Sequence, residues 1–318
     1  MPLSLAQYAE QLAGRPDLNW PEPPEPVPPK ARPHLKPLPG VRAVTWSVYG
    51  TLLVISSGEL YLEHPQKFVM DVALDKTIQE FKMWKAMTRK PGAPAEYMRV
   101  IYQNVLRDLQ CQPAPTGEKY LEIGVERIWE AIVKKLAMNE YTFDLGLYGS
   151  LDEYCKKIAY FFHTSLQGTG PYPDTALTLE ALRGRGYWQG ILADGQCFTG
   201  LQLQRAVEEQ ERGFVLKGAI PEGHRVWSHE LRGKKPSERL FQGMVELLDA
   251  DHIEPHEVLH IGSSIPLDIL PARRSGMRTG LFAGDKNSLQ VSPQQLKDKQ
   301  TRPDIMLTNL SQVLDILD

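Results

Sequence analysis

The chain has 318 residues, of which 42% are hydrophobic and 24% are charged, as is usual for a globular protein with a sizeable core. The formal net charge is -3 and no lysine- or arginine-rich run stands out, so we expect no nucleic-acid partner. No segment approaches the roughly 18 apolar residues of a membrane span, and the N-terminus lacks the features of a secretory signal. These patterns predict a cytoplasmic protein that has no membrane partner. Three widely spaced cysteines, Cys111, Cys155 and Cys197, predict free thiols.

The first 40 residues divide into two segments. Residues 4–14 place apolar side chains at helical spacing, which predicts a short amphipathic helix. Residues 21–40, PEPPEPVPPKARPHLKPLPG, are so rich in proline that helix and central strand are excluded. We expect an extended, polyproline-II-like arm. Two interpretations stay open, a surface strap or linker and a docking segment for a protein partner that recognises proline.

The main fold begins at residue 41. VRAVTW, residues 41–46, predicts a buried strand, and residues 52–64 predict a hairpin that turns at Ser56-Ser57-Gly58. Residues 65–165 then carry apolar side chains at intervals of three and four. This all-α block is predicted to contain four helical segments, at 77–87, 94–109, 124–138 and 151–166.

From Tyr172 onward the chain alternates predicted strands and helices, including a helix over 236–251 with Pro236 near its start and a closing helix after 305. Alternation of this kind predicts a mostly parallel, doubly wound α/β sheet with helices on both faces. The first strand belongs to that sheet, so the helical block is an insertion. We therefore predict an N-terminal helix and proline-rich arm at 1–40, an α/β core at 41–60 plus 166–318, and a helical cap at 61–165.

Doubly wound folds carry their functional residues outside the carboxyl ends of the strands. Four motifs lie at or near such ends, WSVYGTLL at 46–53, GILADG at 190–195, GKKPSERLF at 233–241 and HIGSSIPLDILPARRSGM at 260–277. In order, spacing and placement they resemble the four signature motifs of the haloacid dehalogenase (HAD) superfamily. The resemblance covers residues 41–318 and implies a Rossmann-like hydrolase fold with a helical cap.

The resemblance implies roles for four catalytic positions. Ser47 occupies the position of the nucleophilic aspartate, and Tyr49 that of the acid/base aspartate of phosphatases. Lys235 matches the lysine that neutralises the nucleophile and the substrate, and Asp268 matches a second family acid. The run from Tyr49 to Leu52 resembles the dehalogenase branch, which does not use the second aspartate.

Six further positions match binding or turn positions of the family. Gly50 and Thr51 fit the turn after the first strand. Ala193 replaces the serine or threonine that binds substrate oxygens, and Asp194 follows it. Ser263 replaces the magnesium-binding aspartate, and the pair Ser263-Ser264 again resembles the dehalogenase branch.

The substitutions change the expected chemistry. Magnesium prefers carboxylate oxygens, whereas the two family ligands map to the neutral Ser47 and Ser263, so we predict weak or absent magnesium and no other cofactor. A serine hydroxyl is a poor nucleophile without an adjacent base, and no histidine at motif spacing or GxSxG elbow is present. We expect Ser47 to fill the aspartate's volume and to bond to nearby amides. Lys235 then pairs with Asp194 or Asp268, or binds an anion.

Two functions follow. The favoured hypothesis is a HAD-like pseudoenzyme that binds a small anion or a protein partner, because the nucleophile, the substrate-binding hydroxyl and the metal-binding acid are lost together. The alternative is an active HAD-like hydrolase with altered chemistry on a small phosphorylated or halogenated acid. It is motivated by the retention of Lys235, Asp268 and a full-size cap. The sequence leaves open whether the chain is an enzyme.

Overall fold

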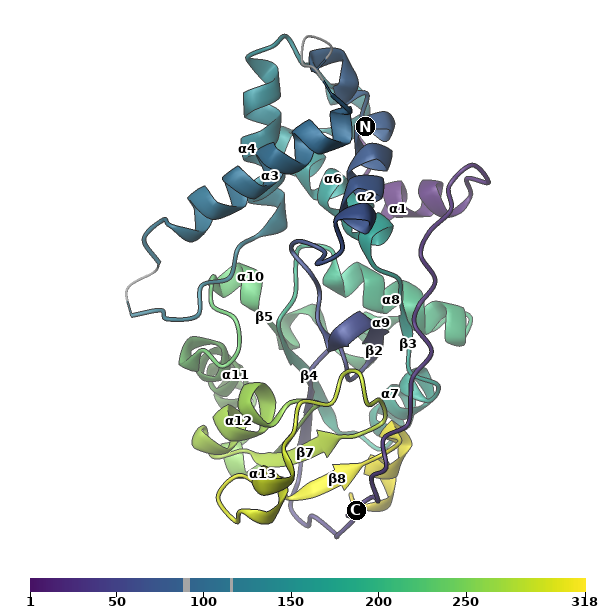
Figure 1. Ribbon diagram of the computed structural model, residues 1–318. Helices are drawn as coiled ribbons and strands as arrows, with labels where there is room; N and C mark the ends of the chain where they lie inside the picture. Colours follow the sequence, from purple (N-terminus) through teal and green to yellow (C-terminus); the bar gives the residue numbers. More distant parts are fainter. Residues whose placement is uncertain (88–91, 115–116) are drawn as a thin grey trace.

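The computed structural model describes residues 1–87, 92–114 and 117–318. It contains a six-stranded parallel sheet in the order β5-β4-β1-β6-β7-β8, beneath a block of helices (Figure 1). The strands are β1 (Ala43–Trp46), β4 (Trp188–Ala193), β5 (Arg225–Trp227), β6 (Val258–Gly262), β7 (Arg278–Phe282) and β8 (Ile305–Leu307). The predicted doubly wound α/β fold is confirmed.

Helices cover both faces of this sheet because its strands alternate the direction of their apolar side chains. Val44 and Trp46 of β1 belong to the apolar cluster that includes α7 (Thr175–Gly184), α8 (Thr199–Gln210) and α9 (Leu216–Ala219). Ala43 belongs to the cluster that includes α11 (Glu238–Ala250) and α12 (Leu270–Arg274). Strand β1 is therefore buried on both faces and lies between β4 and β6. Two further short helices are α10 (Ser228–Leu231) and α13 (Pro293–Lys297).

The inserted block forms the predicted helical cap. Its helices are α2 (Lys67–Glu80), α3 (Pro94–Gln110), α4 (Val125–Ala137), α5 (Leu145–Tyr148) and α6 (Leu151–Leu166), and they enclose an apolar cluster of their own. Helix α6 is central to the cap because Tyr154, Ile158 and Phe162 are fully buried. The expected helix over 77–87 is wrong in its bounds. Helix α2 begins ten residues earlier and ends at Glu80, and only a short 3-10 turn follows at Met83–Ala86.

Three other expectations also differ from the structure. The hairpin around Ser56 does not form, because β2 (Leu53–Ile55) pairs instead with β3 (Thr169–Pro171), which returns after the cap. Pro236 precedes the N-cap Ser237 of α11, so it lies outside that helix. The closing helix is a 3-10 segment, Leu310–Asp315. The first difference arises from a long-range partner, which local periodicity does not encode.

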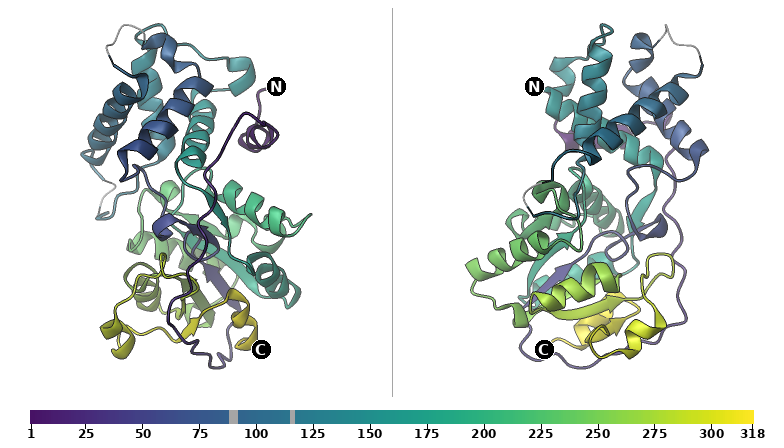
Figure 2. Two further views of the ribbon diagram at one scale, coloured as in Figure 1. Left: turned by 45° about the vertical axis from the view of Figure 1, so that its right-hand side comes forward. Right: turned by 60° about the vertical axis from the view of Figure 1, so that its left-hand side comes forward.

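The N-terminal segment begins with helix α1 (Leu5–Ala13), capped by Ser4 and Gln7 in a capping box. Residues 21–40 then run as an extended arm along the length of the molecule, from the cap to the lower edge of the sheet (Figure 2). The arm's regular pairing is limited, within the described residues, to an isolated antiparallel bridge between His34 and Met306 of β8. Both segments agree with the sequence prediction.

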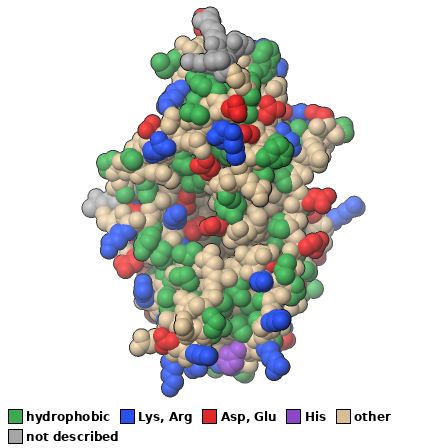
Figure 3. Space-filling model, in the orientation of Figure 1, with side chains coloured by type: hydrophobic (Ala, Val, Ile, Leu, Met, Phe, Trp, Pro, Cys, Tyr) green, Lys and Arg blue, Asp and Glu red, His purple; other side chains and the backbone are tan. Residues whose placement is uncertain are grey.

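The surface shown in Figure 3 carries interspersed acidic and basic side chains, with several basic side chains at its lower end. No helix among the described residues has the length and apolar character to cross a membrane.

Candidate functional site

The motif residues meet where β1, β4 and β6 end, since Ser47, Asp194 and Ser263 each follow the last residue of one of these parallel strands. They line a pocket of about 130 Å³ between the sheet and the cap. Typical sites for drug-sized ligands measure roughly 300–1,000 Å³, so this pocket suits a small ligand. Seven predicted site residues line it, namely Ser47, Tyr49, Asp194, Lys235, Ser263, Ser264 and Asp268.

The centre of the site is a buried ion pair. The ammonium of Lys235 lies 2.5 Å from Oδ1 of Asp268 and donates a hydrogen bond of 3.0 Å to Oγ of Ser47. The two charged side chains are only 2% and 4% exposed. Among the described residues this is the one side-chain hydrogen bond of Ser47, so the expected bonds to amides do not form. The lysine pairs with Asp268 through its side chain.

A backbone amide and a glycine fix the position of the Asp268 side chain. Its Oδ2 accepts a 2.9 Å hydrogen bond from the amide of Ser264, and Gly262 leaves room for it, since a Cβ there would lie 2.2 Å from the Asp268 carboxyl carbon. Burial raises the pKa of Asp268, but the neighbouring Lys235 and His260 together outweigh burial and hold that pKa below its ordinary value. The carboxyl group is therefore a stable anion in the fold.

His260 lies in β6, next to the ion pair. Its Nδ1 is 3.0 Å from the Thr45 hydroxyl, and its Nε2 is 3.6 Å from Asp268 Oδ1. Complete burial lowers the pKa of His260 despite the nearby carboxylate. A neutral imidazole that faces Asp268 does not contact the Ser47 hydroxyl, so it supplies no base for nucleophilic attack.

Asp194 supports the same lysine through the backbone, because its Oδ1 accepts a 2.7 Å hydrogen bond from the amide of Lys235. Burial raises the pKa of Asp194 to about 6, against the opposing effect of the Lys235 charge. Lys235 is thus fixed by one carboxyl at its backbone and by another at its side chain. Of the two ion pairs considered from the sequence, the described residues show the one with Asp268, while Asp194 bonds to the backbone amide of Lys235.

The turn after β1 carries the three remaining predicted site residues of the first motif. The hydroxyl of Tyr49 bonds with Thr199 and Gln202 of α8, at 2.9 and 2.7 Å, so its phenol is anchored to that helix. Gly50 has a φ of +76°, and a Cβ there would lie 2.8 Å from the Ser263 hydroxyl, so the close approach of the two motifs requires glycine. Thr51 is fully buried and lies outside the pocket lining.

The second and fourth motifs contribute unequally. Ala193 is fully buried at the end of β4 and does not line the pocket. Ser263 lines the pocket with a neutral hydroxyl. Ser264 caps the following π-helical turn, Ile265–Ile269, by accepting a 3.2 Å hydrogen bond from the Leu267 amide.

The cap supplies a site residue that sequence reasoning missed. Glu122 is 7% exposed and lines the pocket. Its carboxyl accepts hydrogen bonds from Ser228 Oγ at 2.8 Å and from Gln196 Nε2 at 3.1 Å. Burial, together with the charge of Asp194, raises the pKa of Glu122 to about 7. A carboxyl with a raised pKa in a pocket is a common mark of a functional site, but no local pattern in the helical block singles out this glutamate.

Backbone pairing delivers Glu122 to the pocket. Leu121 and Gly233 form an antiparallel bridge, the amide of Lys234 donates to Tyr120 at 2.8 Å, and the amide of Glu122 donates to Arg232 at 3.3 Å. We call this set of contacts the cap–core bridge. It joins the cap directly to the loop that carries Lys234 and Lys235, so the position of the cap and the position of the lysine loop are coupled.

The donor set does not fit the magnesium site of the phosphatases that the motifs resemble. Both oxygens of Asp268 already accept hydrogen bonds, and the ammonium of Lys235 lies between Asp268 and Ser47. Across residues 1–87, 92–114 and 117–318, no group of three or more His, Cys, Asp or Glu side chains is arranged to hold a metal ion. A dication at Ser47 would meet a neutral hydroxyl and a cation, which is unfavourable.

Comparison with known proteins places the fold. No family profile and no curated sequence matches the chain. The 2-haloacid dehalogenase from Pseudomonas syringae pv. Tomato DC3000 is similar in structure, with a TM-score of 0.51 and 16% identity over 87% of this chain and 97% of that chain. A HAD phosphatase from Thermococcus onnurineus has a TM-score of 0.45 and 18% identity, over 87% and 97% of the two chains. A predicted phosphoglycolate phosphatase from Haemophilus somnus 129pt has a TM-score of 0.44 and 15% identity, over 87% of this chain and 98% of that chain.

The parallel sheet, the cap inserted after its first strand and the similarity to the Pseudomonas dehalogenase define the class of fold. The chain has the haloacid dehalogenase fold in its helically capped form.

Replacing the acid of the buried ion pair should destabilise the protein strongly. Asp268→Asn leaves the Lys235 ammonium buried without a counter-charge, and we expect a loss of about 3–5 kcal/mol in the free energy of unfolding. The double variant Asp268→Asn with Lys235→Met removes both charges and should recover most of that loss. Urea unfolding at pH 7 measures both values. A loss below about 1 kcal/mol in the single variant would contradict a buried, unscreened pair.

The stability of the protein should depend on pH through Glu122. Its pKa rises from 4.5 to about 7 on folding, so the folded state binds the proton more tightly and stability falls as pH rises from about 4.5 to about 7. The Glu122→Gln variant has no carboxyl to titrate at this position, so its stability should lack this dependence on pH. Relative to the wild type, the variant should gain on the order of 2–3 kcal/mol between pH 5 and pH 8. Urea unfolding at several pH values measures the stability of both proteins. If the two stabilities change with pH in the same way, the pKa of Glu122 is not raised in the fold.

Proposed function

We propose that the chain is a hydrolase-fold protein in which the inherited reaction is impaired, and that it binds a small anionic ligand in the pocket at Ser47. The observation that carries this proposal is the Lys235 ammonium, which contacts a serine hydroxyl at 3.0 Å and a carboxylate at 2.5 Å. In the family that the motifs resemble, the lysine faces a nucleophilic aspartate. Here the acid beside the lysine is Asp268, on a different motif.

The ion pair also argues against a serine–lysine dyad. The Nζ of Lys235 donates hydrogen bonds to both Ser47 Oγ and Asp268 Oδ1, so in this arrangement it is a donor to Ser47 and does not accept the serine proton. Ser47 therefore has no partner, among the described residues, that would accept its proton.

The polar lining of the pocket supports an anionic ligand. The hydroxyls of Ser47 and Ser263 and the exposed Lys234 lie along it. Of the four described acids that line it, Asp268 is paired with Lys235. The pKa values of Asp194 and Glu122 are raised to about 6 and about 7, so Glu122 in particular carries only part of its negative charge at neutral pH. A carboxylate or phosphate of a small molecule suits this combination. A cytoplasmic location is part of the same proposal.

An active hydrolase with altered chemistry is the second candidate. The observation that favours it is Glu122, a carboxyl that is poised to exchange a proton near pH 7 in the same pocket as Ser47. It would act on a small phosphorylated or halogenated acid.

A turnover screen separates the two candidates. Phosphate esters and 2-haloacids are incubated with the purified protein, with and without magnesium, and phosphate or halide release is followed. Impaired chemistry predicts release no faster than in the Ser47→Ala control. Turnover that Ser47→Ala abolishes would overturn the proposal in favour of the active hydrolase.

Restoring the family acids should restore metal binding. The double variant Ser47→Asp with Ser263→Asp adds two carboxylates beside the pocket, and we expect magnesium to bind at least tenfold more tightly than to the wild type. The matched control, Ser47→Asn with Ser263→Asn, adds similar volume without charge and should not gain affinity. Calorimetric titration measures both. Equal heats for the two double variants would mean that the geometry of the site has also departed from the family's.

A further inference from the structure

The N-terminal segment makes contacts with both halves of the molecule. Helix α1 packs on α6 of the cap, and Tyr8, Ala9 and Leu12 are buried in the cap's apolar cluster. Arg15 binds Glu80 of α2 with N–O distances of 2.7 and 2.8 Å. Residues 3–15 are therefore attached to the cap, which they adjoin in both views of Figure 2.

The next stretch continues this attachment as far as Trp20. The ring of Trp20 lies edge-on to Phe161 of α6, with centroids 5.2 Å apart. Lys76 of α2 donates a hydrogen bond to the carbonyl of Asn19. The last contact with the cap's apolar cluster is thus made immediately before the proline-rich arm begins.

The arm is then fixed to the α/β layer. Val27 donates its amide to Asp285 at 3.0 Å and accepts from the Lys286 amide at 2.7 Å. His34 exchanges two backbone hydrogen bonds with Met306 of edge strand β8, at 2.8 and 3.0 Å. Leu38 donates to Ile316 at 2.9 Å.

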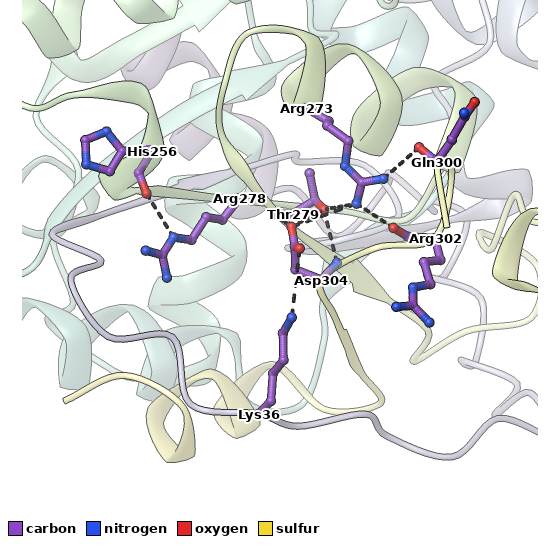
Figure 4. Close-up of polar contacts among 8 residues, drawn as sticks. All are labelled: Lys36, His256, Arg273, Arg278, Thr279, Gln300, Arg302 and Asp304. Carbon is purple, nitrogen blue, oxygen red and sulfur yellow. Dashed lines mark hydrogen bonds and ion pairs between the residues drawn. The ribbon is translucent and has the colours of Figure 1, made fainter. Parts of the chain in front are cut away.

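Figure 4 shows the lower part of this attachment. The Lys36 ammonium points to Asp304, 4.0 Å away, in the loop just before β8. Asp304 in turn accepts hydrogen bonds from the amide and the hydroxyl of Thr279, at 2.9 and 2.8 Å. The arm therefore ends against a part of the core that has its own hydrogen-bond network.

The segment between the two attachments is short and already extended. Six residues, 21–26, lie between Trp20 on the cap and Val27 on the core, and four of the six are prolines. A polyproline-II segment is already extended, at about 3.1 Å per residue, and stiff. A cap movement that increased the distance between Trp20 and Val27 would have to break one of the attachments.

This short segment crosses the hinge of the cap. The chain leaves the core after β2 and returns through Gly168 into β3. A Cβ at Gly168 would lie 2.2 Å from the carbonyl oxygen of Glu22, and one at Gly170 would lie 2.9 Å from Pro23. The arm therefore touches the returning hinge strand at two positions where a side chain would exclude it.

We propose that residues 1–40 form a strap that holds the helical cap closed over the pocket. Closure buries Glu122 and the cap–core bridge against the lysine loop. With the strap in place, the cap and the sheet are joined by the two hinge segments and by a third, stiff connection. Release of the strap opens the route to Ser47 and Lys235. The strap is independent of whether any turnover remains.

Two variants loosen the strap at different points. Gly168→Ala displaces the arm at the hinge, and Tyr8→Ala with Leu12→Ala releases α1 from the cap. Gly184→Ala is the matched control because a Cβ there meets nothing within 4 Å. All are made in a full-length Cys111→Ser background, which removes the exposed thiol. The remaining thiols report on different places, Cys197 beside Glu126 at the cap–core contact and Cys155 inside the cap.

The readouts are thiol labelling at pH 8 and amide hydrogen exchange. Both strap variants should label Cys197 about tenfold faster and should exchange the amides of Glu122 and Lys234 faster. Cys155 and the amides of β6 should stay protected, as in the Gly184→Ala control. Unchanged labelling and exchange in both variants would overturn the strap. Labelling of Cys155 that accelerates as much as that of Cys197 would also overturn the strap, because α1 would then be part of the cap's own fold. If the double variant fails to fold, Gly168→Ala decides by itself.

Discussion

The buried pair of Lys235 and Asp268 is the interaction on which the site depends. Two opposite charges, each almost inaccessible to solvent, are stable there because they contact each other, because the Ser264 amide donates to Asp268 and because the Ser47 hydroxyl accepts from Lys235. The pair joins the loop before α11 to the π-helical turn that follows β6. At the end of β1 the lysine contacts the neutral hydroxyl of Ser47.

The same lysine loop connects the sheet to the cap. Its backbone pairs with residues 120–122 of the cap, and that pairing brings Glu122 into the pocket. The cap in turn is bound by α1 at its own apolar cluster, while the proline-rich arm is fixed to the edge of the sheet. The chemistry of the pocket, the position of the cap and the N-terminal arm are therefore linked through a short series of contacts.

Local sequence patterns predicted the fold well wherever an element's own side chains determine it. The parallel strands, the helices α3, α4 and α6 and the extended arm all follow from periodicity or from proline content. The hairpin at Ser56 was wrong because the partner of β2 lies beyond the whole cap. The bonds expected for Ser47 were also wrong, since an ammonium from a distant loop takes the place of backbone amides.

The sequence alone determined the class of the sheet, the insertion of a helical cap and the residues at the strand ends. These features follow from the order and spacing of the predicted strands and motifs, which can be read without knowing any long-range contact. Only the tertiary structure decided which charges pair, that Glu122 joins the pocket and that the arm crosses the hinge at Gly168. Each of these depends on distances between segments many residues apart, and those distances are fixed by the packing of the sheet, the cap and the arm together.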